Sequence, residues 1–317
     1  MLLSEAIEAL CIATRADGRS PRTVQAYREK LRYLVAFLGD VLIEEVTIHD
    51  LRRYIADLMD RQTRWADHPH HTEVEGGLSP FTIAGRVRAL KRLFNWLEAE
   101  EILQQNPARR IRTPQPKRQD PKGIARQDLL ALLNTTAGGS VIDLRDRAIL
   151  YFLADTGCRI QGLCGLRVQD VDLVRGLAVV REKGDKTRLV PFTRTTAQVL
   201  QDWLKVRPQD RGLTLFVGLG NRAEDGITSN GVAKMLKQRA KRAGVEGPVN
   251  PHAFRHAFAR DFLLHGGDLG TLADLLGHTT VMVTKHYYGI FTVEELQRKH
   301  QQHSPIAQMF EDSDDGK

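Results

Sequence analysis

The first hundred residues carry hydrophobic positions at helical spacing. After Ser20-Pro21, apolar side chains recur every three or four residues until Gly39, and a second run of this kind follows Thr47. A serine or threonine before such a run, with proline in the first turn, is typical of a helix N-terminus. Ser79-Pro80 opens a third run, and a weaker one covers residues 3–13. The pattern predicts a bundle of four helices without strands.

Cations gather on the third run and in the segment that follows it. Arg86 and Lys91 fall on the face opposite the apolar positions of that helix. The next segment mixes prolines with cations, among them Arg109, Arg110, Arg112, Lys117 and Arg118. Prolines and like charges keep such a segment extended. Two interpretations stay open, a solvated linker or a strap along a DNA backbone, where each cation releases a counterion.

The rest of the chain mixes strand and helix patterns. Residues 177–180 and 188–192 read as two short strands joined by a turn at 182–186, and residues 213–217 are a candidate third strand. Helical periodicity predicts further helices at 128–133, 144–154, 195–206, 229–242, 251–265, 269–275 and 293–302. The acidic end of the chain predicts a disordered tail.

Composition narrows the class of protein and of partner. A length of 317 residues suits two domains, and a net charge of +7 favours a polyanionic partner. The three cysteines, Cys11, Cys158 and Cys164, are an odd number without metal-type spacing, which indicates a reducing compartment. No apolar run approaches the roughly 20 residues of a membrane span, and the acidic start does not resemble a leader peptide. The expected location is the cytoplasm, with no membrane partner.

Residues that can handle a phosphate gather near the end of the chain. His252 and Arg255 lie three apart on a predicted helix and so share a face. Gly277 can turn His278 back toward them, and Tyr287 follows nine residues later. Guanidinium groups match the charge of phosphate oxygens, histidines move protons, and a tyrosine hydroxyl can attack phosphorus. With Arg159 from upstream, this set favours cutting and rejoining DNA through a covalent protein–phosphate link.

The same residues, in this order and with these gaps, resemble the signature of the tyrosine recombinase (integrase) family, particularly its Xer-like members. Six residues match its catalytic positions: Arg159, Lys183, His252, Arg255, His278 and Tyr287. The resemblance implies a mainly α fold, in which a helical, SAM-like core-binding bundle precedes a mostly α catalytic domain with a small antiparallel sheet. Its implied boundaries are 1–108 for the bundle, 109–122 for a basic linker, 123–303 for the catalytic domain and 304–317 for a tail that docks onto a neighbouring protomer.

The resemblance also implies a mechanism without metal or other cofactor. Tyr287 forms a 3′-phosphotyrosyl link, while Arg159, Arg255 and His278 hold the phosphate oxygens. His252 assists proton transfer at the tyrosine, and Lys183 protonates the leaving oxygen. The implied partners are double-stranded DNA and three further copies of the chain, forming a tetramer on two DNA sites that passes through a Holliday junction. An accessory or paired recombinase protein is left open as a further partner.

One departure and several alternatives accompany this interpretation. The family usually has an acidic residue three positions after its first arginine, where this chain has Gly162; Asp170 or Asp172 are candidate substitutes. Tyr288 is the rival nucleophile and Lys186 the rival lysine. A type IB topoisomerase-like enzyme and a catalytically weakened DNA-binding protein on the same fold are the alternative functions. The histidines in residues 67–71 are not expected to form a metal site.

Overall fold

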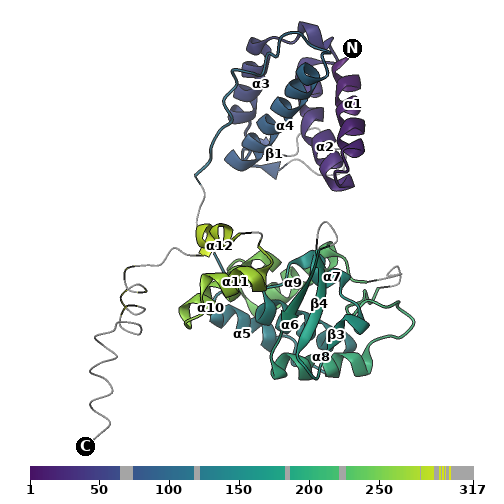
Figure 1. Ribbon diagram of the computed structural model, residues 1–317, viewed down its shortest axis with the longest axis vertical. Coiled ribbons are helices and arrows are strands. Elements are labelled where there is room, and N and C mark those ends of the chain that lie inside the picture. The colour runs from purple at the N-terminus through teal and green to yellow at the C-terminus, as the bar shows by residue number, and fades with distance from the viewer. Residues whose placement is uncertain are drawn as a thin grey trace, which may run out of the picture. The chain divides into compact units, whose positions relative to one another are not determined.

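The structure is a computed structural model that describes residues 1–64, 74–117, 122–182, 186–220, 226–278, 280–288, 293, 295, 297 and 300. For Glu182, Lys186, Val283, His286 and Tyr287 this covers the backbone alone. The chain divides into two compact units, residues 1–119 and 120–317 (Figure 1). Each unit buries a hydrophobic core of its own. Across the described residues, no helix combines the length and apolar character that a membrane crossing demands.

The N-terminal unit is built from four α-helices, as the hydrophobic pattern predicts. They are α1 (Leu3–Ala16), α2 (Pro21–Leu38), α3 (Ile48–Asp60) and α4 (Pro80–Ala99), with a short 3-10 helix η1 (Ile43–Glu45) before α3. The predicted starts of α2, α3 and α4 are confirmed, since Ser20, Thr47 and Ser79 each accept a hydrogen bond from the backbone N–H three residues on. Side chains from all four helices, among them Leu10, Leu34, Tyr54 and Leu90, form the core.

Two details of this unit differ from the prediction. Strands β1 (Thr63–Arg64) and β2 (Val74–Glu75) pair antiparallel, although no strand was expected. They are too short to show an alternating pattern. Arg86 was expected on the solvent face of α4, but only 7% of it is exposed and its guanidinium carbon lies 3.6 Å from the centre of the Tyr33 ring. The stacked aromatic ring covers the arginine, which helical periodicity alone does not reveal.

The C-terminal unit is mainly helical. Its helices are α5 (Arg126–Asn134), α6 (Val141–Thr156), α7 (Ile160–Gly165), α8 (Arg194–Val206), α9 (Ser229–Ala243), α10 (Pro251–Leu264), α11 (Leu269–Leu276) and α12 (Val281–Tyr288), together with the 3-10 helix η2 (Val168–Asp170). Helix α6 packs against both α8 and α10. Its Phe152 lies within 6.3 Å, centre to centre, of the Phe192 and Phe216 rings.

A three-stranded antiparallel sheet lies beside these helices, in the order β3 (Val171–Asp172), β4 (Leu177–Glu182), β5 (Lys186–Pro191). The predicted pairing of β4 with β5 is confirmed, with Val179 opposite Leu189. The prediction of a third strand at 213–217 was wrong, because the segment forms only isolated bridges and β3 supplies the third strand. The carbonyl groups of 214 and 215 accept hydrogen bonds from the side chains of Arg207 and Trp203 instead of from a neighbouring strand.

Two helices of this unit were not expected. Helix α7 has six residues, two of which are glycines, so it offers no periodicity to detect. Helix α12 reads Val-Met-Val-Thr-Lys-His-Tyr-Tyr, and β-branched and aromatic residues are weak helix formers. It forms because it packs on α10 and α11, and Figure 1 shows these three helices together. The helix predicted at 293–302 lies mostly outside the described residues.

Candidate active site

Arg255 lies at the centre of the candidate site and is 5% exposed. Helix α10 presents it in the second turn after an N-terminus that Asn250 caps and Pro251 opens. Its Nη1 donates to the Gly157 carbonyl at 2.9 Å and its Nη2 to the Leu276 carbonyl at 2.6 Å. These bonds join α10 to the ends of α6 and α11. They hold the guanidinium plane in a fixed orientation, as recognition of a phosphate requires.

Arg159 reaches the same place from the turn after α6. Both of its terminal nitrogens lie 3.5 Å from the Gly277 carbonyl. Gly277 has φ of +64° and ends α11 in the left-handed conformation that favours glycine. The structure therefore brings together two arginines 96 positions apart in sequence, as the predicted phosphate clamp requires.

The turn at Gly157 that leads to Arg159 also requires glycine. Its φ is +56°, and a Cβ there would lie 2.7 Å from the Phe258 ring. A side chain at this position would push the end of α6 away from α10. Arg159 therefore depends on this close approach of the two helices for its position.

His278 touches the clamp directly. Its Nε2 lies 3.0 Å from Nη2 of Arg255, and its Nδ1 lies 2.7 Å from Oγ1 of Thr284 on α12. The predicted turn after Gly277 thus aims the histidine at the arginine. Thr284 was not among the predicted site residues. Its place six residues after His278 was the only signal in the sequence, and spacing does not reveal a side-chain contact.

The remaining predicted catalytic residues are less fully defined. His252 lies on α10 one turn before Arg255 and is exposed. Tyr287 lies on α12 by its backbone, and its side chain is outside the described residues, as is all of Lys183. The side chain of the rival Lys186, at the start of β5, is also outside them.

Tyr288, the rival nucleophile, is packed in a core. It is 6% exposed and belongs to an apolar cluster with residues of α10 and α11. Its ring stacks parallel to that of His278 with centres 6.2 Å apart, and lies 5.3 Å from that of His256. Burial, and next the neighbouring His252 and Arg255, lower the pKa of His256.

Gly162 occupies the sequence position at which the family usually has an acidic residue. A Cβ at this position would lie 2.3 Å from Cγ1 of Val180 and 3.1 Å from Sγ of Cys158. Helix α7 therefore approaches β4 too closely for a larger residue. Asp172, a candidate substitute, accepts hydrogen bonds from the backbone of residues 174 and 175 within its own turn.

Gly162→Ala should lower the free energy of unfolding of the C-terminal unit. The same substitution made in a protein that already carries Val180→Ala should raise it, because the shortened side chain leaves room for the added methyl group. Overpacking costs about 1–3 kcal/mol, which exceeds the roughly 1 kcal/mol that alanine gains over glycine within a helix. Denaturant unfolding of the four proteins of the cycle measures this. Gly165→Ala is the matched control, because a Cβ there meets nothing within 4 Å. Stabilisation by Gly162→Ala in both backgrounds would contradict the overpacking.

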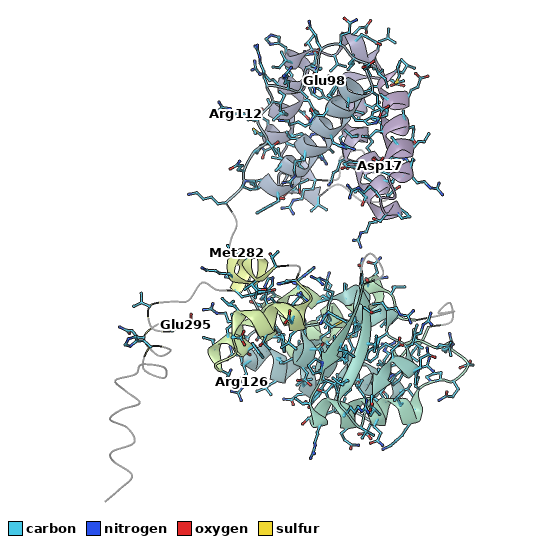
Figure 2. All side chains as sticks on the ribbon, viewed as in Figure 1. Asp17, Glu98, Arg112, Arg126, Met282 and Glu295 are labelled. Carbon is cyan, nitrogen blue, oxygen red and sulfur yellow. The ribbon has the colours of Figure 1, made fainter. Side chains whose placement is uncertain are left out.

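The predicted DNA-contacting cations fall into two groups. Arg86 is buried, and Lys91 donates from Nζ to the Ile111 carbonyl at 2.7 Å. The exposed ones in the basic segment are Arg109, Arg110, Arg112 and Lys117, whereas Arg118 lies outside the described residues. Figure 2 labels Arg112, whose neighbour Ile111 is buried in the core of the N-terminal unit. The start of the segment is thus fastened to that unit while its charges face solvent.

No group of three histidine, cysteine or carboxylate side chains able to hold a metal occurs among the described residues. Residues 67–71, with their three histidines, lie outside them. The absence of a metal or cofactor stays a prediction.

Comparison with known proteins defines the class to which this fold and clamp belong. Residues 123–292 match the phage integrase family, and residues 14–101 match the phage integrase N-terminal SAM-like domain. The chain belongs to the phage integrase family.

Within that family it is a tyrosine recombinase. It is 32% identical to tyrosine recombinase XerD of Yersinia pestis over 90% of this chain and 92% of that protein. It is 30% identical to tyrosine recombinase XerC of Corynebacterium efficiens over 94% and 91%. A structure of the Tn1549 transposon integrase in complex with circular intermediate DNA shares the fold, with a TM-score of 0.73 at 19% identity over 95% of this chain and 99% of that one.

Proposed function

We propose that Arg159, Arg255 and His278 bind the DNA phosphate at which this recombinase cuts and rejoins a strand. The convergence of Arg159 and Arg255 on the turn at 276–278 is the observation that carries the proposal. Two fixed guanidinium groups can neutralise the charge that spreads over the non-bridging oxygens in the transition state. Backbone carbonyls now occupy some of their N–H donors, and an incoming phosphate competes for these donors with a full negative charge.

Tyr287 supplies the nucleophile in this proposal. Its hydroxyl oxygen attacks phosphorus, its proton passes to a base, and the bond to the 5′-oxygen breaks. His252 assists the loss of the tyrosine proton, and Lys183 donates a proton to the leaving oxygen. The products are a 3′-phosphotyrosyl link and a free 5′-hydroxyl. A 5′-hydroxyl from a partner strand then reverses the step, so one phosphoester replaces another without an external energy source.

The wider assembly is part of the same proposal. The two units, joined through the basic segment, would bind double-stranded DNA mainly through its phosphates. Four copies on two DNA sites would exchange strands through a Holliday junction, with residues 304–317 docking onto a neighbour and an accessory or paired recombinase as a further partner. A cytoplasmic location follows if the substrate is prokaryotic chromosomal or plasmid DNA.

Mapping of the covalent link tests the proposal. The full chain is incubated with genomic DNA of its source organism, and the DNA that stays bound after denaturation is sequenced. Nicked duplexes of that sequence then trap the link for peptide mass spectrometry. We expect the nucleotide adduct on Tyr287. An adduct on another residue would refute the assignment, and binding without an adduct would favour a non-catalytic DNA-binding protein. Relaxation of supercoils without recombinant product would favour the topoisomerase alternative.

A further inference from the structure

Both ring nitrogens of His278 have partners whose chemistry defines the tautomer. A guanidinium group donates hydrogen bonds and does not accept them, so Nε2 of His278 must accept from Nη2 of Arg255 at 3.0 Å. A neutral imidazole then carries its single proton on Nδ1. That N–H donates to Oγ1 of Thr284 at 2.7 Å. The hydroxyl of Thr284 thus selects the form of His278 that fits Arg255.

Thr284 belongs to the helix that carries the nucleophile. It lies on α12 three residues before Tyr287 and is fully buried, whereas Met282 of the same helix is 69% exposed (Figure 2). Tyr288 follows one turn after Thr284, so both side chains share a face of the helix. The Tyr288 ring stacks on His278 with an angle of 2° between the planes. Helix α12 therefore orients His278 by a hydrogen bond and by a stacked ring.

We propose that Thr284 is a positioning residue for strand cleavage, which fixes the protonation and orientation of His278 and couples them to the docking of α12. The inference rests on the proposed role of His278 at the phosphate. When α12 is docked, the histidine and the backbone of Tyr287 take their places together. When α12 is displaced, His278 loses its Nδ1 partner, so the oriented His278 and the nucleophile are brought to the clamp in a single step.

The hydroxyl of Thr284 can keep its hydrogen bond to His278 when a DNA phosphate binds. A phosphate oxygen that takes the Nη2 donor of Arg255 leaves Nε2 of His278 without it. Nε2 can then bind a proton and donate to the phosphate, while Nδ1–H stays bonded to Thr284. Oγ1 accepts from Nδ1–H in both the neutral ring and the imidazolium. A methyl group in its place would leave the Nδ1 proton without this acceptor in a part-buried position, which disfavours the cation.

Two substitutions of Thr284 distinguish the contribution of its hydroxyl from the contribution of its packing. Thr284→Val keeps the shape and removes the hydroxyl, whereas Thr284→Ser keeps the hydroxyl. Rates of covalent complex formation are measured with the full chain on a nicked duplex, together with the Kd for that duplex. We expect Thr284→Val to cleave about ten- to a hundredfold more slowly, the worth of one hydrogen bond to a charged group, with Kd within about twofold. Thr284→Ser should stay within about threefold of the unmodified protein.

Nitrogen-15 NMR of the unmodified protein provides a readout that does not depend on the Thr284 variants. The His278 signals, assigned with His278→Gln, should show a protonated Nδ1 and an unprotonated Nε2 at a pH where the ring is neutral. A protonated Nε2, full activity of Thr284→Val, or equal loss in Thr284→Ser and Thr284→Val would each overturn the inference. If the unmodified protein forms its link at Tyr287 and Thr284→Val is equally fast, only the role of Thr284 fails. If the unmodified protein forms no link, the proposed site fails with it.

Discussion

Tyr287→Phe should abolish the covalent complex on a nicked duplex and leave DNA binding intact. Phenylalanine keeps the ring and removes the only atom of the side chain that can attack phosphorus. The residual reaction should fall below detection, because no other group would form the phosphoester. The Kd for DNA should change by about twofold or less, as for a substitution that removes a single hydroxyl group. Denaturing gels measure the complex, and gel shift or fluorescence anisotropy measures binding.

Tyr288→Phe is the discriminating companion of this variant, since it removes the rival hydroxyl from the adjacent position. The Tyr288 ring is buried between the rings of His256 and His278, and phenylalanine retains both ring contacts. We therefore expect Tyr288→Phe to form the covalent complex and Tyr287→Phe to form none. The reverse pattern would transfer the nucleophile to Tyr288 and would require α12 to rotate when DNA binds. Loss of the complex in both variants would point to a fault in the docking of α12.

The helix starts were predictable because their signals are local. Ser20, Thr47 and Ser79 each cap a helix whose apolar positions follow immediately, so a few neighbouring residues decide the structure. The same reasoning fails where distant contacts decide. Helix α12 has weak intrinsic propensity and forms on α10 and α11, and Arg86 is buried because Tyr33 of another helix covers it. Such contacts are absent from any window of the sequence.

In the candidate site, too, the sequence reveals which residues take part but not which contacts hold them. Spacing and residue type were enough to select Arg159, Arg255 and His278, and the fold brings these three together. Spacing could not reveal that backbone carbonyls hold the two arginines, or that Thr284 binds the far side of the His278 ring. Those contacts arise where α10 packs against α6, α11 and α12, and the turns at Gly157 and Gly277 end α6 and α11 there.

A buried ion cluster lies on α6, toward the opposite end of that helix from Gly157. Asp146 is 3% exposed and accepts from two arginines, one on each carboxylate oxygen. Oδ1 binds Nε and Nη2 of Arg145 at 3.0 and 2.7 Å, and Oδ2 binds Nε and Nη2 of Arg239 at 2.9 and 2.7 Å. Arg239 also pairs with Asp143 at 2.9 Å and donates to the Thr135 carbonyl at 2.6 Å. The cluster fastens α6 to α9 and to the end of α5.

Asp146→Ala should destabilise the C-terminal unit by about 3–5 kcal/mol. The loss exceeds that of an ordinary hydrogen bond because the substitution leaves Arg145 and Arg239 buried, with Asp143 as the remaining carboxylate in the cluster. Asp143 is more exposed, and its removal leaves Asp146 in place, so Asp143→Ala should cost less. Denaturant unfolding of the full chain, followed by a signal from Trp203 in the C-terminal core, measures both. If Asp146→Ala does not fold, Asp143→Ala still measures how much the cluster contributes to the free energy of unfolding.

Asp202→Ala is the control for charge removal as such. Asp202 pairs with Lys205 at 2.8 Å on the surface of α8, where water and salt screen the interaction. We expect this variant to change the free energy of unfolding by no more than the error of the measurement. Equal effects of Asp146→Ala and Asp202→Ala would contradict the argument that burial makes the cluster important.

A destabilised α6 should also weaken phosphate binding, because Gly157 at its far end supplies the carbonyl that holds Arg255 and precedes Arg159 by two residues. The loss of cleavage activity in Asp146→Ala should therefore accompany its thermal unfolding, at a lower temperature than in the unmodified protein, since α6 supplies part of the core of the unit.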